Sequence, residues 1–242
     1  MLVKFSLALL LAIFSAEFVS GTKNCSQAVQ KMDDTFKTAI FIKQGLKIPA
    51  NDKEISHHCT LGKQFLKDAK GFSSCSKPFP NQVITILGKS LVKTTKSMCK
   101  AGKERTRLTN FLECMTPEYH STAQKIGLLM VNQLYTLSKN VTNEQMFPLI
   151  CCSFNTLISS MRTVPEPKCK TSIKLNDYLI EQVNRLIKDL TDLLCGKWST
   201  PADCERAEPQ LFERMNQIRD AGNFLNDQSL IGTILDVVEK LS

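Results

Sequence analysis

The sequence lacks the short patterns that mark most enzyme and nucleotide-binding sites. It contains no Gly-x-Ser-x-Gly turn, no His-Glu-x-x-His helix, no phosphate-binding loop and no dinucleotide-binding glycine pattern. Histidine is also scarce, with three residues in a chain of 242. A Ser-His-Asp triad assembled from distant positions is an alternative, although His120 alone gives it little support. We therefore expect a protein with no catalytic residues and no cofactor.

Two sites suggested by the cysteines each lack a necessary group. His57-His58-Cys59 offers nitrogen and sulfur ligands, but a thiolate ligand requires a reduced cysteine, which an oxidising compartment disfavours. We expect no metal site there and place both histidines on an exposed helix surface. The adjacent Cys151 and Cys152 are similar to the pair of secreted phospholipases, which have a histidine three residues later. Asn155 stands at that position and no glycine-rich calcium loop precedes it, so this class is excluded.

Long hydrophobic runs are absent beyond the first residues, so no transmembrane segment is expected. The apolar run from Phe5 to Phe14 is too short to cross a bilayer, which takes about 20 residues. Lys4 precedes this run and the small residues Val19-Ser20-Gly21 follow it, which predicts a secretory signal peptide over residues 1–21. Cleavage after Ser20 or Ala16 is an alternative, as is a buried N-terminal helix. Residues 22–242 are expected to form a helical cysteine-rich domain outside the cell.

Cysteine, in contrast, is plentiful. Ten cysteines follow the predicted signal, and an even number in an exported chain predicts a disulfide framework. They can pair in about 945 ways, so spacing alone does not give the connectivity. Two glycosylation sequons, at Asn140 and Asn24, fit a secreted glycoprotein, although a cysteine stands in the middle of the second. All ten cysteines are expected to form bridges: Cys25, Cys59, Cys75, Cys99, Cys114, Cys151, Cys152, Cys169, Cys195 and Cys204.

The chain is basic, with a formal net charge of +8 that survives signal removal because Lys4 and Glu17 cancel. Four lysines follow one another at spacings of four, three and four, which places them on one helix face: Lys89, Lys93, Lys96 and Lys100. This face is a candidate site for an acidic glycan, lipid or protein. A solvated face without a partner is the alternative. We expect no nucleic acid partner, because no aromatic residues interleave the lysines as stacking platforms.

Apolar residues recur at spacings of three and four through most of the chain, and no stretch alternates long enough to predict a strand. The fold class is therefore all-α: a disulfide-stapled bundle of about eight or nine amphipathic helices. Ser229 is placed to cap the last helix, and Pro209 to divide the one before it. The predicted helices cover residues 26–44, 54–70, 81–99, 104–115, 117–140, 143–161, 172–195, 202–220 and 229–241.

A bundle of this kind can enclose a cavity for a lipid or another small apolar ligand. An ordinary packed core is the alternative. Six phenylalanines are candidates to line such a cavity: Phe65, Phe72, Phe79, Phe111, Phe147 and Phe154.

The cysteine spacing predicts a weak internal repeat over residues 59–99 and 152–195. Cys59, Cys75 and Cys99 are separated by 16 and 24 residues, and Cys152, Cys169 and Cys195 by 17 and 26. Each set fits a short helix, a proline-containing loop and a long amphipathic helix, with coincidence as the alternative. In a simple hairpin Cys152 and Cys195 lie at very different heights, so we expect no bridge between them. Cys151 and Cys152 point about 100° apart on a helix, which predicts bridges to two different neighbours.

Three features together resemble the cysteine-rich helical secreted proteins of arthropods, typified by the 27-kilodalton hemolymph glycoproteins. These features are Cys75 with Ser76-Lys77-Pro78-Phe79-Pro80, Cys99 followed by Cys114, and Cys151-Cys152 with Cys169 and Leu193-Leu194-Cys195. The likeness spans roughly residues 55–204 and rests mainly on cysteine spacing within amphipathic helices. It implies an extracellular-fluid protein without a known catalytic site, and it carries over no functional residue.

These observations favour a secreted, hemolymph-like, non-enzymatic binding protein of extracellular fluid. Its ligand is expected to be a small apolar molecule or an acidic partner. A secreted saliva or venom effector that acts on a foreign protein is the alternative, because a signal peptide and bridged cysteines fit both.

Overall fold

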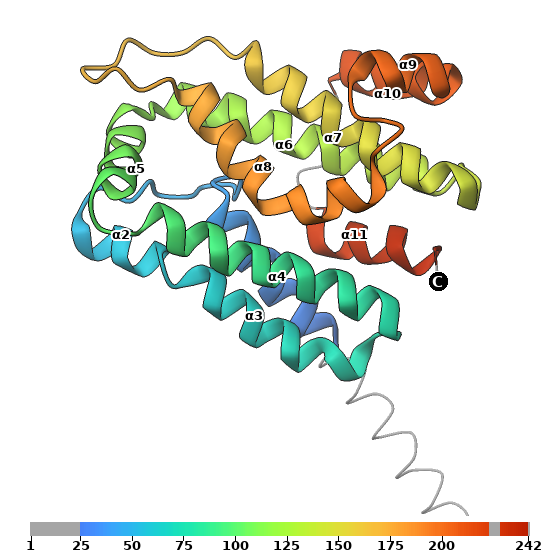
Figure 1. Cartoon of the computed structure of the whole chain (residues 1–242), viewed down its shortest axis with the longest axis horizontal. Helices are drawn as coiled ribbons and strands as arrows, with labels where there is room; N and C mark the ends of the chain where they lie inside the picture. Colours follow the sequence, from blue (N-terminus) through green and yellow to red (C-terminus); the bar gives the residue numbers. More distant parts are fainter. Residues whose placement is uncertain (1–24, 223–227, 242) are drawn as a thin grey trace, which may run out of the picture.

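The computed structural model describes residues 25–222 and 228–241, which are mostly helical and form no strand (Figure 1). The all-α, disulfide-stapled fold class is thus confirmed. The helices are residues 25–39, α2 (Asp52–His58), α3 (Leu61–Phe72), α4 (Pro78–Met98), α5 (Lys103–Cys114), α6 (Pro117–Ser138), α7 (Met146–Arg162), α8 (Leu175–Leu194), α9 (Pro201–Ala207), α10 (Pro209–Ala221) and α11 (Leu230–Glu239). Short 3₁₀ turns occupy Ser73–Cys75 and Asn143–Gln145.

Each predicted helix corresponds to helix in the structure, but the described chain has more helices than eight or nine. The predicted helix over residues 54–70 is divided into α2 and α3 at Cys59, which caps α2. Pro209 divides the 202–220 segment as expected, because it begins α10, where a proline ring fits and no backbone donor is needed. Ser229 caps α11 as predicted, since its hydroxyl accepts the backbone N–H of Gly232 at 2.8 Å.

The disulfides connect all ten cysteines and divide most of the chain into two units of like organisation. We call residues 25–99 the first unit and residues 114–195 the second unit. In the first unit the first cysteine pairs with the third and the second with the fourth, as Cys25–Cys75 and Cys59–Cys99. The second unit has the same order once Cys152, which pairs outside the unit, is set aside: Cys114–Cys169 and Cys151–Cys195. A fifth bridge, Cys152–Cys204, attaches α9 to α7.

Cys151 and Cys152 therefore bind two different neighbours, as predicted, and Cys152 does not pair with Cys195. The simple hairpin assumed for that argument is wrong, however, because the adjacent Cys151 does reach Cys195, with their Cα atoms 5.4 Å apart. The reason is the connection over residues 163–174, which runs well beyond the end of α7 before α8 begins (gold loop, Figure 1). That offset brings the two distant helix positions to the same level.

The first unit packs α3 against α4 with very little space between their backbones. A methyl group added at Gly62 would lie 2.8 Å from the Cα atom of Val92 and 2.9 Å from the carbonyl oxygen of Leu91. Phe65 and Leu91 lie beneath this contact and are buried with the helix over residues 25–39. Glycine thus sets the separation of these two helices.

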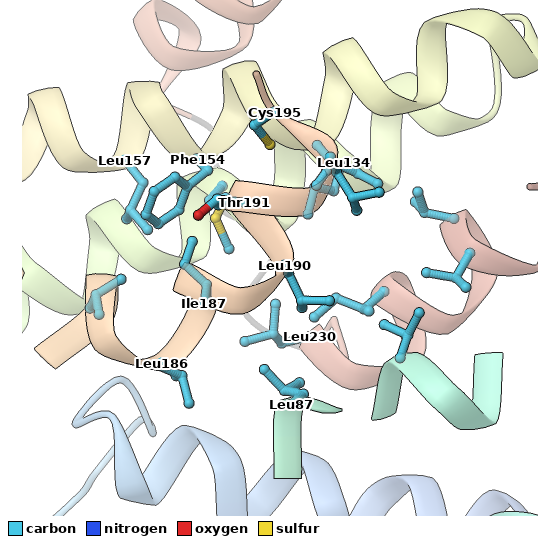
Figure 2. A pocket seen from close by; sticks show the side chains of 18 of the residues that line it. Leu87, Leu134, Phe154, Leu157, Leu186, Ile187, Leu190, Thr191, Cys195 and Leu230 are labelled. Atoms are coloured by element: carbon cyan, nitrogen blue, oxygen red, sulfur yellow. The ribbon is translucent and has the colours of Figure 1, made fainter. Parts of the chain in front are cut away.

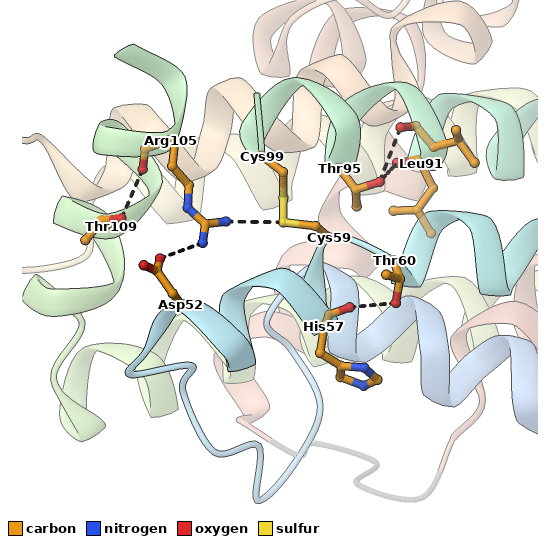
Figure 3. Close-up of a disulfide and its surroundings, with 10 residues drawn as sticks. Asp52, His57, Cys59, Thr60, Leu91, Thr95, Cys99, Arg105 and Thr109 are labelled. Carbon is orange, nitrogen blue, oxygen red and sulfur yellow. Dashed lines mark hydrogen bonds and ion pairs between the residues drawn. A yellow bond between two sulfur atoms is a disulfide. The ribbon is translucent and has the colours of Figure 1, made fainter. Parts of the chain in front are cut away.

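The Cys59–Cys99 bridge closes the first unit at the junction of α2 and α3. Arg105 of α5 directs one guanidinium nitrogen to the Cys59 sulfur at 3.5 Å and another to the Asp52 carboxylate at 2.9 Å (Figure 3). The side chain of Arg105 therefore links the bridge to the segment that follows the first unit.

Candidate functional site: a central apolar cavity

The second unit and α11 enclose a cavity of about 160 Å³ near the centre of the bundle. Most of its wall comes from α6, α7 and α8, while α4, α11 and residues 36–42 close the remaining sides. Figure 2 shows Leu190 of α8 in the middle of this space, with Leu87 of α4 and Leu230 of α11 nearby. Segments from both ends of the chain therefore meet at one site.

The wall of the cavity is almost wholly hydrocarbon. Thr191 contributes the one hydroxyl among the described lining residues, and it already donates to the backbone oxygen of Lys188 at 3.1 Å. Cys195 contributes a disulfide sulfur, which bonds weakly at best. The site therefore offers a ligand no free side-chain donor and no charge, and the Thr191 hydroxyl oxygen is its one side-chain oxygen acceptor.

Three of the six predicted phenylalanines line the cavity, namely Phe79, Phe147 and Phe154. Phe65, Phe72 and Phe111 belong instead to the packed core, where each is at most 5% exposed. Phe36 lines the cavity and was not predicted, and neither was the wall that α11 provides. The apolar stripe of α8 was visible in the sequence, but no local pattern indicated that this stripe faces a space rather than another helix.

A polar groove lies directly outside the cavity, over the Cys151–Cys195 bridge. Phe154, Thr191 and Cys195 line both spaces and therefore form the partition between them. Figure 2 shows these three side chains close together, Phe154 from α7 and the others from α8 and its end. The groove also contains amide and charged side chains, among them Asn155, Arg162, Asn184 and Asp192. Movement of the Phe154 ring would connect the cavity with this groove.

The histidines do not form a reactive group in the described residues. The prediction that both His57 and His58 are exposed is wrong for His58, which is 3% exposed and stacks on the Phe41 ring at 4.5 Å. Burial lowers the pKa of His58 from 6.5 to about 4, although a hydrogen bond to the Ala39 backbone opposes the shift. Nε2 of His120 lies 2.8 Å from the Phe41 carbonyl oxygen.

His58 and His120 both contact a strained turn beside the cavity. Phe41 has a φ of 61°, a left-handed conformation that is unusual for a residue with a side chain. Its neighbours Ile40 and Ile42 line the cavity. The contacts of His58 and His120 with Phe41 thus hold part of the cavity wall in place.

The other predicted sites fall in different places. Within the described ranges, no group of three or more histidine, cysteine, aspartate or glutamate residues could hold a metal ion, and Cys59 is bridged. Asn140 is exposed in the turn after α6, which leaves its amide accessible. Asn24 and the predicted signal peptide lie outside the described residues. Lys89, Lys93, Lys96 and Lys100 are all exposed along α4 and at its end, far from the apolar side of that helix.

None of the helices in the described ranges has the length and apolar character needed to cross a membrane. Comparisons with family models, with curated proteins and with solved structures find no match to this chain. The resemblance to the arthropod hemolymph glycoproteins therefore stays a prediction.

Proposed function

We propose that this protein is a secreted, hemolymph-like, non-enzymatic binding protein of extracellular fluid that carries a small apolar molecule or lipid chain in its central cavity. The cavity is the observation that carries the proposal. The five disulfides support its extracellular part, because such bridges persist in oxidising compartments.

The cavity is energetically costly when empty. At about 24 cal/mol per Å³, a sealed void of this size costs about 4 kcal/mol relative to a filled core, which is the upper bound for this cavity. Dry cavities of about 150 Å³ lined by leucine, isoleucine and phenylalanine take up small apolar molecules such as benzene. A ligand without polar groups in its buried part fits this wall, since the Thr191 hydroxyl oxygen is the one side-chain oxygen that a buried polar group could meet there.

Its chemistry supports binding rather than catalysis. The three histidines, as far as the described residues extend, contact neither a serine hydroxyl nor a carboxylate in the arrangement that nucleophilic catalysis requires. The groove outside Phe154 offers water and polar side chains to the exposed end of a ligand.

The test measures binding of benzene, an uncharged apolar probe of the size that such a cavity admits, to the purified full-length secreted protein by isothermal titration calorimetry. We expect one saturable site per chain, and competition by material extracted with organic solvent from protein of the native source. Leu190→Phe places a larger side chain in the cavity and is expected to lower affinity at least about tenfold, or about 1.4 kcal/mol. Leu46→Phe adds the same volume at a half-buried position outside the cavity and serves as the control.

Equal loss of affinity in both variants, or probe binding that never saturates, would reject the cavity as the site. Native mass spectrometry of the source protein provides a second readout. A stoichiometric apolar adduct supports the proposal, and the chain mass reports whether residues 1–21 are removed and whether glycan is attached.

A further inference from the structure

The hairpin of α3 and α4 carries nearly all of the net charge of the protein. Residues 61–100 contain eight lysines and one aspartate, which leaves seven positive charges, whereas the whole chain has a formal net charge of +8. All eight lysines are exposed. They are Lys63, Lys67, Lys70, Lys77, Lys89, Lys93, Lys96 and Lys100.

Seven of these lysines form two rows. Lys63, Lys67 and Lys70 follow at spacings of four and three on α3, and Lys89 to Lys100 follow at four, three and four on α4 and its end. With 3.6 residues per turn, each row keeps to one face of its helix. The α4 row spans about 16 Å along the helix axis.

Both rows lie on the same outer surface. The faces opposite the lysines are buried in the core, through Phe65 and Phe72 on α3 and through Leu87 and Leu91 on α4. The two helices touch along their sides, where Gly62 and Gly88 face the partner helix. Each helix therefore has one side on the core and one side on its partner helix. The side opposite the core points to solvent on both helices, in the same general direction. We call this surface the lysine plate, defined by Lys63, Lys67, Lys70, Lys89, Lys93, Lys96 and Lys100.

The lysine plate is unneutralised in the described structure. None of its seven lysines forms an ion pair with a described carboxylate, whereas Arg107 and Arg185 each pair with Glu104 and Glu181 elsewhere. Asp68 is half-buried and accepts from Gln64 at 3.0 Å. Like charges that are held close together repel one another. Binding of an anion therefore lowers the electrostatic free energy of such a surface.

We propose that the lysine plate binds an extended sulfated polysaccharide. Regularly spaced ammonium groups match a linear chain with repeated sulfates, each bound as a point charge. Exposed positions on α3 and α4 hold lysine, glutamine, glycine and Pro78, with no large aliphatic or aromatic side chain to enter a bilayer. No aromatic platform for nucleic acid bases is present on these exposed positions either. The site is distinct from the cavity and does not depend on it.

Retention on immobilised heparin and its salt dependence test the proposal with the full-length secreted protein. The triple variant K63Q/K67Q/K70Q removes the α3 row, and K89Q/K93Q/K96Q removes three of the four lysines of the α4 row. Each is expected to elute at lower salt and to reduce the slope of log affinity against log salt by about two to three, because fewer counterions are released. The matched control K125Q/K168Q/K197Q removes the same charge from exposed lysines elsewhere and is expected to bind like the original protein.

Several outcomes would overturn the proposal. An equal loss in the control would show that net charge alone drives retention, and loss from one row only would reject the two-row site. Undiminished binding to desulfated heparin, or equally tight binding to phosphatidylserine vesicles, would assign the surface to another partner. Thermal unfolding of each variant checks that lost retention does not come from lost structure.

Discussion

The first and second units share a pattern of bridges but differ in how closely their helices pack. In the first unit, Gly62 brings α3 into near contact with the backbone of α4. In the second unit, Phe154 and Leu157 of α7 and Val183 and Ile187 of α8 line a cavity between helices. Disulfides at corresponding positions therefore fix connectivity without fixing helix separation. The side chains at the interface determine whether a unit closes tightly or holds a space.

The two units also divide the proposed roles. The tight unit presents charge on its outer surface, at the lysine plate, and the open unit provides most of the cavity wall. With Cys152 set aside, both units pair their first cysteine with the third and their second with the fourth, which is what a duplication would leave. Cys151, rather than the predicted Cys152, occupies the place of Cys59 in that comparison. The duplication itself stays a prediction.

Removing one bridge from each unit gives the largest expected effects. Cys59–Cys99 and Cys151–Cys195 close loops of 40 and 44 residues, so the chain-entropy model predicts nearly equal losses of stability. We expect each paired alanine substitution to lower the free energy of unfolding by about 4 kcal/mol. Alanine is preferred to serine because Cys151 is 1% exposed and a buried hydroxyl would add a separate cost. Urea denaturation measures both losses.

The same pair of variants separates stability from ligand binding. Only the loss of Cys151–Cys195, which borders the cavity, is expected to weaken binding of the apolar probe. A difference in stability above about 2 kcal/mol would show that native contacts, not loop length, dominate one of the bridges. Equal weakening of probe binding in both variants would contradict the assignment of the cavity to the second unit.

Acid is expected to act first on the first unit, through His58. The folded protein keeps this imidazole neutral down to a pKa of about 4, whereas the unfolded chain binds a proton near pH 6.5. Its contribution to stability is therefore complete above pH 6.5 and falls by about 3 kcal/mol as the pH drops to 4. The buried Nε2 atom of His58 has no partner among the described residues, so a proton there would be unsatisfied.

Urea denaturation between pH 7 and pH 4 measures this loss, and His58→Phe isolates it. Phenylalanine preserves the stacking on Phe41 but does not titrate. Glu181 is a separate source of acid sensitivity, because hydrogen bonding to Arg107 lowers its pKa in the folded protein and its stabilisation is lost as the pH falls below its ordinary value. If the variant keeps the full slope of stability against pH, His58 is not the group responsible.

Much of the fold followed from the sequence because helix signals are local. The stripe of α8, the cap at Ser229 and the break at Pro209 each depend on residues within a few positions of one another. The burial of His58 was missed because it depends on Phe41, which precedes it by 17 positions across a turn that no pattern marks. The offset of α7 and α8 was missed for the same reason, because the sequence of residues 163–174 does not indicate how far this connection extends before α8 begins.

The cavity was harder to predict than the helices around it. Its wall combines residues 36–42 with α11, and nothing in either segment indicates that they meet. The lysine row of α4 was visible from spacing alone, but the matching row on α3 gained meaning only when Gly62 and Gly88 placed the two helices side by side. Both candidate sites, the cavity and the lysine plate, thus depend mainly on how separate helices are placed against one another.

Adding one methyl group to each unit gives the smallest and most direct test of the packing difference. Gly62→Ala would place a methyl 2.5 Å from the Thr95 hydroxyl and within 3 Å of the α4 backbone, which must then move. We expect a loss of about 1–2 kcal/mol in the free energy of unfolding, because overpacking outweighs the gain in helix propensity. Val183→Ile adds its methyl at the cavity wall and is expected to raise stability by about 0.5–1 kcal/mol. Chemical denaturation of both single variants and of the double variant measures these effects and any coupling between the two sites. Destabilisation by Val183→Ile equal to that of Gly62→Ala would mean that the second unit is as tightly packed as the first.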